Sequence, residues 1–561
     1  MKLPRPAAFL HVALLLAAAL PVAAHAEDKP VPPPVAATGT EPKLIVAIAV
    51  DQFSADLFAE YRSRFTGGLA RLAGGVVFPS GYQSHAATET CPGHSTILTG
   101  AHPSRTGAVS NSWYDLSLAR KNKKLNCLED PAQTPQGDEE YVVTTRTLMV
   151  PTLGERMKAA NPASRNVAVS GKDRGAVMMG GTDTDAIVWW RERRFETLRG
   201  RTLDPAAVAE NGKVTAAVAK GLPDYRLPAW CGSLAGPVQS GNATIGTGRL
   251  ALKAGDARAF RYTPRLDRST LTIALGMVDE EQLGRQTAPD MLAISLSATD
   301  YIGHAFGNQG PEMCIQMQQL DAALGDFFKE LDKRRIDYAV VLTGDHGATD
   351  TVERLNQRAV PGADRFDSAF LAENLGKAVA ARLGLTLDGP LLWRDTSSSD
   401  YFISTAITPA QRDAVIAEVK AMMAGNPKVA AVYSAAEIEA IPVPAGAPET
   451  WTLLQRARAS YYPGRSGDFL ILPSRGVVMV GTPGVGYTAQ HGGPWDYDRR
   501  VPILFWRKGL AGFEQPMPVE AVDIAPTLAA WIGLPVPAGA FDGRCLDIDG
   551  GAADFCGGTA K

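Results

Sequence analysis

The chain has 561 residues, of which 45% are hydrophobic and 20% are charged, and its formal net charge is −3. This is an ordinary globular composition, and the length suits one large α/β core with insertions. The near-balanced charge argues against a nucleic-acid partner or a membrane-binding surface, because either would favour clustered Lys and Arg.

The N-terminus has the pattern of a cleavable export signal. Two basic residues precede an apolar stretch over residues 7–24, and Ala26 ends a small-x-small sequence of the kind that signal peptidase cleaves. We therefore predict a signal peptide over residues 1–26 and a periplasmic or secreted protein after cleavage near Ala26. Residues 27–42 contain three consecutive prolines and predict a flexible spacer. No later segment approaches the roughly 18 consecutive apolar residues of a membrane-spanning helix, so no membrane span is expected.

Short apolar runs that end in a polar residue recur after the spacer. Residues 43–50 form such a run, apolar on both faces, and Asp51 follows it. The pattern returns at three later places: residues 166–170, 291–298 and 338–343. Helical patterns lie between the runs, for example over residues 315–333. Strands that alternate with helices predict an α/β fold with a mostly parallel central sheet and helices on both faces.

The polar residues at these strand ends point to a single site. In open α/β sheets, ligands bind beyond the carboxyl ends of the strands. We expect six side chains from distant parts of the sequence to meet at that edge: Asp51, Lys172, Arg174, Asp300, Asp345 and His346.

Two stretches interrupt the alternation of strands and helices. Residues 178–287 are rich in turn residues and polar runs, and residues 385–465 combine helical patterns with a proline-rich turn. We predict both as insertions that cap the site. The predicted catalytic domain spans residues 43–545 with these two inserted cap regions, and residues 546–561 form a C-terminal tail.

The six cysteines are an even number, which permits disulfides in an exported protein. No two of them have the C-x-x-C spacing of a metal or redox site. Cys545 and Cys556 close a short loop and are predicted to pair. The pairing of the other four cysteines stays open.

Histidines and carboxylates occur together at several of the strand ends. Asp300 and His304 are spaced i, i+4 and would face one point from a helical turn, whereas Asp345 and His346 are adjacent. His491 lies in a Gln-His-Gly-Gly turn. Sets of carboxylate and imidazole groups suit Zn²⁺, which accepts both oxygen and nitrogen donors. Three further histidines near residue 90 are expected to be structural: His85, His94 and His102.

The set of motifs resembles the alkaline phosphatase superfamily. Its order is similar to that of the phosphodiesterase/nucleotide pyrophosphatase branch and, more closely, to that of the phosphate-irrepressible alkaline phosphatases with a threonine nucleophile. The resemblance extends over residues 43–545. The motifs that carry it are Asp51 after the first strand, Thr90-Cys91-Pro92-Gly93-His94, Asp300-x-x-x-His304, Gly344-Asp345-His346-Gly347 and the late His491.

The resemblance implies an enzyme that uses two Zn²⁺ ions. One ion would be held by Asp300, His304 and His491. The other would be held by Asp51, Asp345 and His346, with the oxygen of Thr90 as its fourth partner. Thr90 would be the nucleophile and would carry the phosphoryl group as phosphothreonine. Three further residues match the family's phosphoryl-binding groups: Asn111, Lys172 and Arg174.

Elementary chemistry agrees with that assignment. Phosphate monoesters hydrolyse extremely slowly without a catalyst, so the protein must activate a nucleophile, accept leaving-group charge and neutralise phosphoryl oxygens. Zinc next to the Thr90 hydroxyl would lower its pKa. Arg174 offers a planar fork, Lys172 a point charge and Asn111 a neutral donor. We therefore expect a zinc-dependent alkaline phosphatase, a phosphoric monoester hydrolase whose partners are small phosphate esters.

Three alternatives differ in the features they require. A sulfatase would need a C/S-x-P-x-R motif, but Pro92 follows Cys91 directly and no arginine stands at the required place. A phosphodiesterase would share the nucleophile and the metal ligands, and the charge of Lys172 and Arg174 favours the dianionic monoester over it. A binding module with a structural zinc would fill all four coordination positions with protein ligands, whereas the sets found here leave positions open.

Overall fold

The computed structural model describes residues 41–561 except 138–139, 552–554 and 557–561. The predicted signal peptide and almost all of the predicted spacer therefore lie outside the described residues. Part of the predicted C-terminal tail does so as well.

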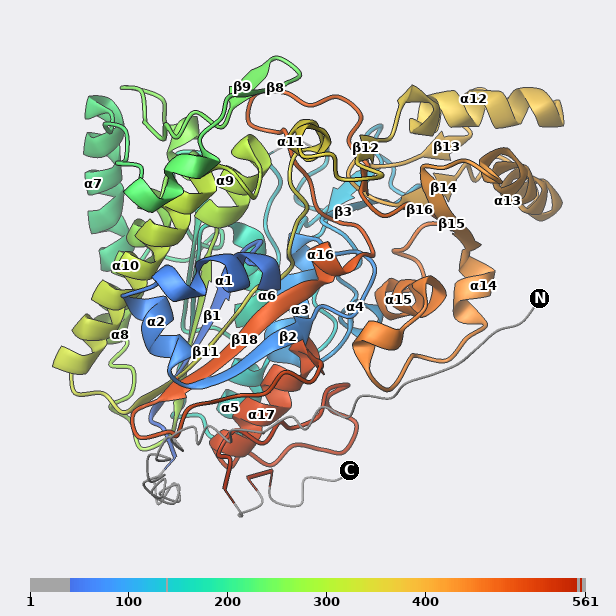
Figure 1. Ribbon diagram of the computed structural model, residues 1–561. Coiled ribbons are helices and arrows are strands. Elements are labelled where there is room, and N and C mark those ends of the chain that lie inside the picture. The colour runs from blue at the N-terminus through green and yellow to red at the C-terminus, as the bar shows by residue number, and fades with distance from the viewer. Residues whose placement is uncertain (1–40, 138–139, 552–554, 557–561) are drawn as a thin grey trace, which may run out of the picture. The chain divides into compact units, whose positions relative to one another are not determined.

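A ten-stranded mixed sheet forms the centre of the fold (Figure 1). Its strand order is β19-β2-β18-β11-β1-β10-β5-β6-β7, and β20 pairs with β2. The strands are β1 (Leu44–Val50), β2 (Val76–Tyr82), β5 (Asn166–Ser170), β6 (Ala186–Arg191), β7 (Arg194–Glu196), β10 (Asp290–Leu296), β11 (Tyr338–Thr343), β18 (Arg500–Arg507), β19 (Phe513–Glu514) and β20 (Val519–Glu520). The inner strands β11, β1, β10, β5 and β6 are parallel, whereas β18 runs antiparallel to both of its neighbours. The prediction of a mostly parallel sheet is confirmed.

Strand β1 shows why the sheet is covered on both faces. All seven of its residues are buried, and successive side chains point to opposite sides. Val46 and Ile48 belong to one hydrophobic core, and Ala47 and Ala49 belong to another. A strand that is apolar on both faces needs a layer of helices on each side, as the sequence predicts.

The helices fall into two layers according to the core they join. The first core includes side chains of α1 (Ala55–Tyr61), α2 (Gly68–Ala73), α7 (Pro205–Lys220), α8 (Arg265–Glu280), α9 (Ala298–Phe306) and α10 (Pro311–Lys333). The second core includes side chains of α3 (Thr90–Thr99), α5 (Leu153–Ala160), α6 (Asp173–Gly180) and α17 (Ile524–Trp531). This layered arrangement places the start of α3, α6 and α9 near the carboxyl ends of the parallel strands.

The first predicted insertion, residues 178–287, is closely joined to the central sheet. It contributes β6 and β7 to the sheet edge, and α6 connects β5 to β6 as in a parallel βαβ unit. It also contains the small hairpin of β8 (Val238–Ser240) and β9 (Ala243–Ile245). β7 has only three residues, whereas β6 is an apolar run of the same kind as β5 that the sequence analysis did not identify. The insertion boundaries themselves stay predictions.

The second predicted insertion, residues 385–465, contains most of a separate antiparallel sheet. Its strand order is β13-β14-β16-β15, and it has hydrophobic clusters of its own. The strands are β13 (Leu392–Trp393), β14 (Asp400–Ile403), β15 (Val429–Ser434) and β16 (Phe469–Pro473). The helices that pack with it are α12 (Ala372–Leu383), α13 (Pro409–Met423), α14 (Ala435–Glu439) and α15 (Leu453–Ser460).

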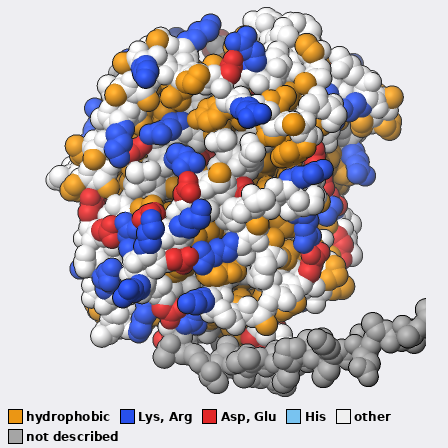
Figure 2. All heavy atoms as spheres, turned by 60° about the vertical axis from the view of Figure 1, so that its left-hand side comes forward, with side chains coloured by type: hydrophobic (Ala, Val, Ile, Leu, Met, Phe, Trp, Pro, Cys, Tyr) orange, Lys and Arg blue, Asp and Glu red, His pale blue; other side chains and the backbone are white. Residues whose placement is uncertain are grey.

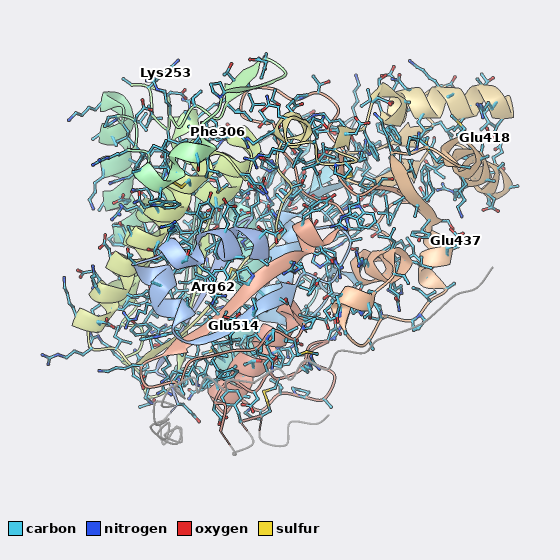
Figure 3. All side chains as sticks on the ribbon, viewed as in Figure 1. Arg62, Lys253, Phe306, Glu418, Glu437 and Glu514 are labelled. Carbon is cyan, nitrogen blue, oxygen red and sulfur yellow. A yellow bond between two sulfur atoms is a disulfide. The ribbon has the colours of Figure 1, made fainter. Side chains whose placement is uncertain are left out.

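Shorter elements complete the described chain. They are β3 (Ser112–Tyr114), β4 (Lys124–Asn126), β12 (Asp364–Arg365), β17 (Val477–Val478), α4 (Pro103–Thr106), α11 (Val352–Gln357) and α16 (Asp496–Arg499). Basic and acidic side chains are intermixed on the face in Figure 2, as the near-neutral charge suggests. One exposed ion pair joins Arg62 to Glu514 at 2.7 Å, and Figure 3 labels both residues. Across the described ranges, no helix combines the length and apolar character needed to cross a bilayer.

Three disulfides connect all six cysteines. Cys545 pairs with Cys556, which confirms the prediction. The two pairings that the sequence left open are Cys91 with Cys127 and Cys231 with Cys314. The first of these joins the start of α3, next to Thr90, to the hairpin of β3 and β4, which directly follows Asn111.

Candidate active site

The carboxyl ends of the parallel strands bring together residues that are far apart in the sequence. Asp51 directly follows β1. One glycine separates Asp345 from the end of β11, and one glycine separates Lys172 from the end of β5. Asp300 lies in the first turn of α9, directly after β10. All four side chains are buried. Because β5, β10, β1 and β11 are parallel neighbours, their ends open onto one edge of the sheet.

Asp300, His304 and His491 form the first candidate metal group. Their ligand atoms lie within 4.8 Å of one another. Asp300 Oδ1 is 3.3 Å from Nε2 of His304 and 3.3 Å from Nε2 of His491. Each imidazole donates its Nδ1–H to a carbonyl, that of Ala489 for His304 and that of Thr88 for His491. Both Nε2 atoms are thereby left as acceptors that face Asp300, the orientation that metal-binding histidines need.

The second candidate group differs from the expected set in one member. The group consists of Asp51, Asp300 and His346, so Asp300 stands in it where Asp345 was expected. Asp345 Oδ2 is 2.9 Å from Nδ1 of His94 and 3.4 Å from Nε2 of His346. Its carboxylate is therefore turned partly toward His94. The two groups share Asp300, so they form one continuous cluster at the strand ends.

Gln52 orients Asp345, a role that the sequence analysis did not predict. Its backbone N–H donates to Asp345 Oδ1 over 3.0 Å, and its side chain donates to Asn308 Oδ1 over 2.6 Å. Its φ of +66° lies in the left-handed region, which costs energy for a residue with a side chain. A Gln immediately after a strand-end Asp carries no local signal for that conformation.

The chemistry of this cluster fits cations. Five buried polar atoms have no hydrogen-bond partner within the described part of the chain: both Oδ atoms of Asp51, Oδ1 of Asp300, Oδ2 of Asp345 and Nε2 of His346. Burial, together with repulsion from Asp345, raises the pKa of Asp51 well above its usual value. Among the described residues, Lys172 is the one ammonium that contacts the buried carboxylates of Asp51 and Asp300, so negative charge is in excess there, and a bound cation removes the cost of that excess. Oxygen and imidazole donors in this mixture suit Zn²⁺.

Lys172 lies among the carboxylates of the cluster. Its Nζ is 2.7 Å from Asp51 Oδ2, 2.5 Å from Asp300 Oδ2 and 3.5 Å from Thr90 Oγ1. Burial disfavours its charge, but Asp300 and Asp51 outweigh that effect and raise the pKa of Lys172. The ammonium therefore stays charged and supplies part of the positive charge that the carboxylates require.

Arg174 takes a different position from Lys172. Its Nη1 is 3.5 Å from Asp173 Oδ1, and the same carboxylate accepts a hydrogen bond of 2.6 Å from the hydroxyl of Tyr141. Its side chain is 22% exposed, whereas that of Lys172 is 4% exposed. The structure thus places one expected phosphoryl ligand inside the cluster and the other toward its more exposed side.

Thr90 and Asn111 meet at the start of α3. Thr90 is the first residue of this helix and is buried. The next backbone N–H, that of Cys91, donates to Asn111 Oδ1 over 2.9 Å.

Glu89, which the sequence analysis did not identify, is also buried at the start of α3. Its carboxylate accepts hydrogen bonds from Ser110 and Asn111. Burial raises the pKa of Glu89 to about 8. The available signal was its position directly before Thr90, the expected nucleophile.

Two aromatic rings and side chains from both predicted insertions lie close to the cluster or to Asn111. The ring of Tyr487 stacks on His304 with centroids 4.7 Å apart. The ring of Tyr301 has Lys172 Nζ at 4.9 Å and Arg261 Cζ, from the first predicted insertion, at 5.1 Å. Asp395, from the second predicted insertion, accepts a hydrogen bond of 2.7 Å from the hydroxyl of Ser112, next to Asn111.

The three expected structural histidines also have definite places. His94 bonds through Nε2 to Ser295 Oγ at 2.8 Å and contacts Asp345, so it borders the cluster. His102 contacts Glu520 and Asp542 in the C-terminal part of the domain. His85 is fully buried. None of the three belongs to the metal groups found among the described residues.

Known proteins with the same overall organisation are found by sequence and by structure. The family model for type I phosphodiesterase / nucleotide pyrophosphatase matches residues 45–497. Alkaline phosphatase PhoK of Sphingomonas sp is 50% identical over 553 residues, which cover 97% of this chain and 99% of PhoK. Alkaline phosphatase PhoD of Zymomonas mobilis is 46% identical over 517 residues, covering 92% and 89% of the two chains. The crystal structure of alkaline phosphatase PafA matches with a TM-score of 0.78 at 25% identity, covering 91% of this chain and 99% of PafA.

Proposed function

The chain belongs to the type I phosphodiesterase / nucleotide pyrophosphatase family of the alkaline phosphatase superfamily and is an alkaline phosphatase-type hydrolase; from this premise we propose that it is an exported, zinc-dependent phosphatase of phosphate monoesters. Thr90 is its nucleophile and carries the phosphoryl group as phosphothreonine. The observation that carries the proposal is the position of the buried Thr90 hydroxyl, 3.5 Å from Lys172, whose ammonium also contacts the carboxylates of Asp51 and Asp300.

Two sets of residues would hold the zinc ions. Asp300, His304 and His491 would hold one. Asp51, Asp345 and His346, with the oxygen of Thr90, would hold the other, and the shared proximity of Asp300 supports a close pair of sites. For Asp345 to join, its carboxylate turns from His94 toward His346, which is already 3.4 Å away. When bound, zinc would supply Lewis acidity that lowers the pKa of hydroxyl groups and stabilises developing negative charge on oxygen.

The remaining residues bind and orient the phosphoryl group. Thr90 presents its hydroxyl from the first turn of α3, where the backbone N–H groups of the helix favour negative charge. Asn111 supplies a neutral carboxamide donor beside it. Lys172 and Arg174 supply two positive charges for non-bridging oxygens. Since Lys172 is buried, its interaction with a phosphoryl oxygen is strengthened by exclusion of water.

The positive charges of Lys172 and Arg174 favour a monoester over a diester as the substrate. A monoester carries nearly two negative charges on three non-bridging oxygens, whereas a diester carries one charge on two such oxygens. A phosphodiesterase remains the second candidate, because the family that matches the chain includes such enzymes by its description. Comparing kcat/KM for a chromogenic monoester and a chromogenic diester on the zinc-loaded protein tests the proposal. We expect the monoester to be preferred by orders of magnitude, and a preference for the diester would overturn the assignment.

Export is supported by the cysteines. All six are paired in disulfides, and disulfides persist in oxidising compartments such as the periplasm or the exterior. Together with the predicted cleavage near Ala26, this favours a periplasmic or secreted enzyme that acts on small phosphate esters. N-terminal sequencing of the mature protein should begin near Glu27, and an intact N-terminus in the exported form would contradict the cleavage.

A further inference from the structure

Asn111 is held by three hydrogen bonds from residues around the nucleophile. Its backbone N–H donates to Glu89 Oε2 over 2.8 Å. Its backbone carbonyl accepts from the N–H of Cys127 over 3.0 Å, and its Oδ1 accepts from the N–H of Cys91 over 2.9 Å. The described residues offer no partner to its Nδ2 atom, so this donor alone stays free. Asn111 is thus fixed at three polar atoms with its carboxamide N–H₂ available.

The carboxylate of Glu89 is directed away from its own helix. Glu89 is the N-cap residue of α3, a position at which Ser, Thr, Asp and Asn side chains commonly accept from the first N–H groups of the helix. Glu89 makes no such capping bond. Both of its oxygens instead accept from the hydroxyl of Ser110 at 3.1 Å, and Oε2 also accepts from Asn111. A buried carboxylate is costly, and here its hydrogen bonds are directed at the loop that carries Asn111.

The other supports of this loop are attached at different points. The disulfide between Cys91 and Cys127 connects α3 to the end of the hairpin. Asp395 contacts Ser112 and Lys124, on the hairpin but beyond Asn111. Glu89 is therefore the side chain among the described residues that bonds directly to the backbone of Asn111.

We propose that Glu89 is a positioning residue for phosphoryl transfer: by holding the N–H of Asn111, it fixes the point at which the Asn111 carboxamide N–H₂ meets a phosphoryl oxygen. The inference rests on the proposed function. Small displacements of a donor from the reacting group strongly reduce its effect, so a loop residue needs such a constraint.

A double-mutant cycle tests this inference on the zinc-loaded, full-length mature protein. The variants are Glu89→Ala, Asn111→Ala and the double variant, each assayed for kcat/KM on a chromogenic phosphate monoester. We expect each single substitution to lower kcat/KM by about tenfold or more, because each removes a charge-assisted or transition-state hydrogen bond. If Glu89 acts through Asn111, the double variant should lie within about threefold of Asn111→Ala alone. Both single variants should also divide their loss of kcat/KM between kcat and KM in the same way, because both act through the same carboxamide.

Two further variants separate positioning from general damage. Glu89→Gln keeps an acceptor oxygen for the N–H of Asn111 and should recover most of the activity lost in Glu89→Ala. Ser110→Ala disturbs the same carboxylate but leaves its bond to Asn111, and we expect a loss below about threefold. A loss in Ser110→Ala as large as in Glu89→Ala would overturn the inference. Should Glu89→Ala not fold, as judged by zinc content and thermal midpoint, Glu89→Asp replaces it in the cycle with a shorter carboxylate.

The outcomes of the cycle distinguish the inference from the proposed function. Losses that multiply in the double variant would show that Glu89 acts independently of Asn111, which overturns the inference and leaves the proposed function intact. Wild-type activity in Asn111→Ala would instead overturn the proposed role of Asn111, and the inference with it.

Discussion

Asn111 and Lys172 are both expected to bind the phosphoryl group, yet the protein holds them in opposite ways. Asn111 is fixed by three hydrogen bonds to groups that would not themselves hold metal. Lys172 is fixed by ion pairs to Asp51 and Asp300, which we propose as zinc ligands. A neutral donor can be positioned by hydrogen bonds alone. A buried cation is positioned by the negative charge around it, so its place depends on what else neutralises that charge.

This contrast predicts different responses to metal. We expect the position of Asn111 to be the same with and without zinc. We expect Lys172 to leave its carboxylate partners when zinc is bound, which frees its ammonium for the substrate.

The largest effect should come from Thr90→Ala, which removes the proposed nucleophilic hydroxyl beside which Asn111 and Lys172 are held. We expect kcat for monoesters to fall by about 10⁴-fold or more, while most of the zinc stays bound. Acid quenching during turnover should place phosphate on the peptide that contains Thr90. Ser95→Ala, one turn further along α3, is the control and should keep the labelled peptide. Phosphate on Ser95 or Ser110 would refute the assignment.

Removal of metal should have the next largest effect, and it should affect the surroundings of Lys172 but not those of Asn111. We expect about two zinc ions per chain, as the two candidate groups suggest. Chelation should abolish activity and zinc should restore it, because the nucleophile and leaving group both need charge stabilisation. Asp300→Ala should lower the zinc content more than Asp173→Ala, a control carboxylate outside both groups. Full activity of metal-free protein would end the zinc proposal.

Replacing Lys172 and Arg174 tests the contrast between charged and neutral phosphoryl-binding groups. We expect the double variant of Lys172→Ala and Arg174→Ala to lose about 10²- to 10³-fold in kcat/KM for monoesters. Diester hydrolysis should fall much less, because a diester lacks the third non-bridging oxygen and the second charge. Asn111→Ala is the matched control, since a neutral donor should affect both substrates. Equal losses of both activities in the double variant would favour the phosphodiesterase alternative.

The smallest effect on activity should come from His102, which lies outside both regions. Burial opposes its charge, but hydrogen bonds to Asp542 and Glu520 outweigh burial and raise the pKa of His102 to about 9. A raised histidine pKa stabilises the folded state fully below pH about 6.5, and this contribution is lost as pH rises through about 9. At about 1.4 kcal/mol per pKa unit, it amounts to at most about 3 kcal/mol.

His102→Asn should therefore lower the thermal midpoint at pH 6 to 7 and leave kcat nearly unchanged. The difference in midpoint from the unsubstituted protein should shrink between about pH 6.5 and 9, the unfolded-state and folded-state pKa values of His102. A difference that stays constant over this range would show that packing, and not the charge of His102, provides the stabilisation.

The sequence by itself determined the local elements and the edge at which the site lies. The apolar runs at residues 166–170 and 338–343 are strands with those bounds, and Asp300 and His304 share one helix as their spacing predicts. Periodicity reports such features because a strand or a helical turn depends on residues that are near in the chain. The roles of Thr90, Asn111 and the expected metal ligands remain proposals.

Only the tertiary structure decided how these elements meet. The pairing of Cys91 with Cys127 and of Cys231 with Cys314 joins segments 36 and 83 residues apart. Asp345 turns toward His94, and Glu89 turns away from its own helix to Asn111, 22 residues later. Local propensity says nothing about such contacts, because which side chains meet is set by packing and by the burial of polar groups throughout the fold.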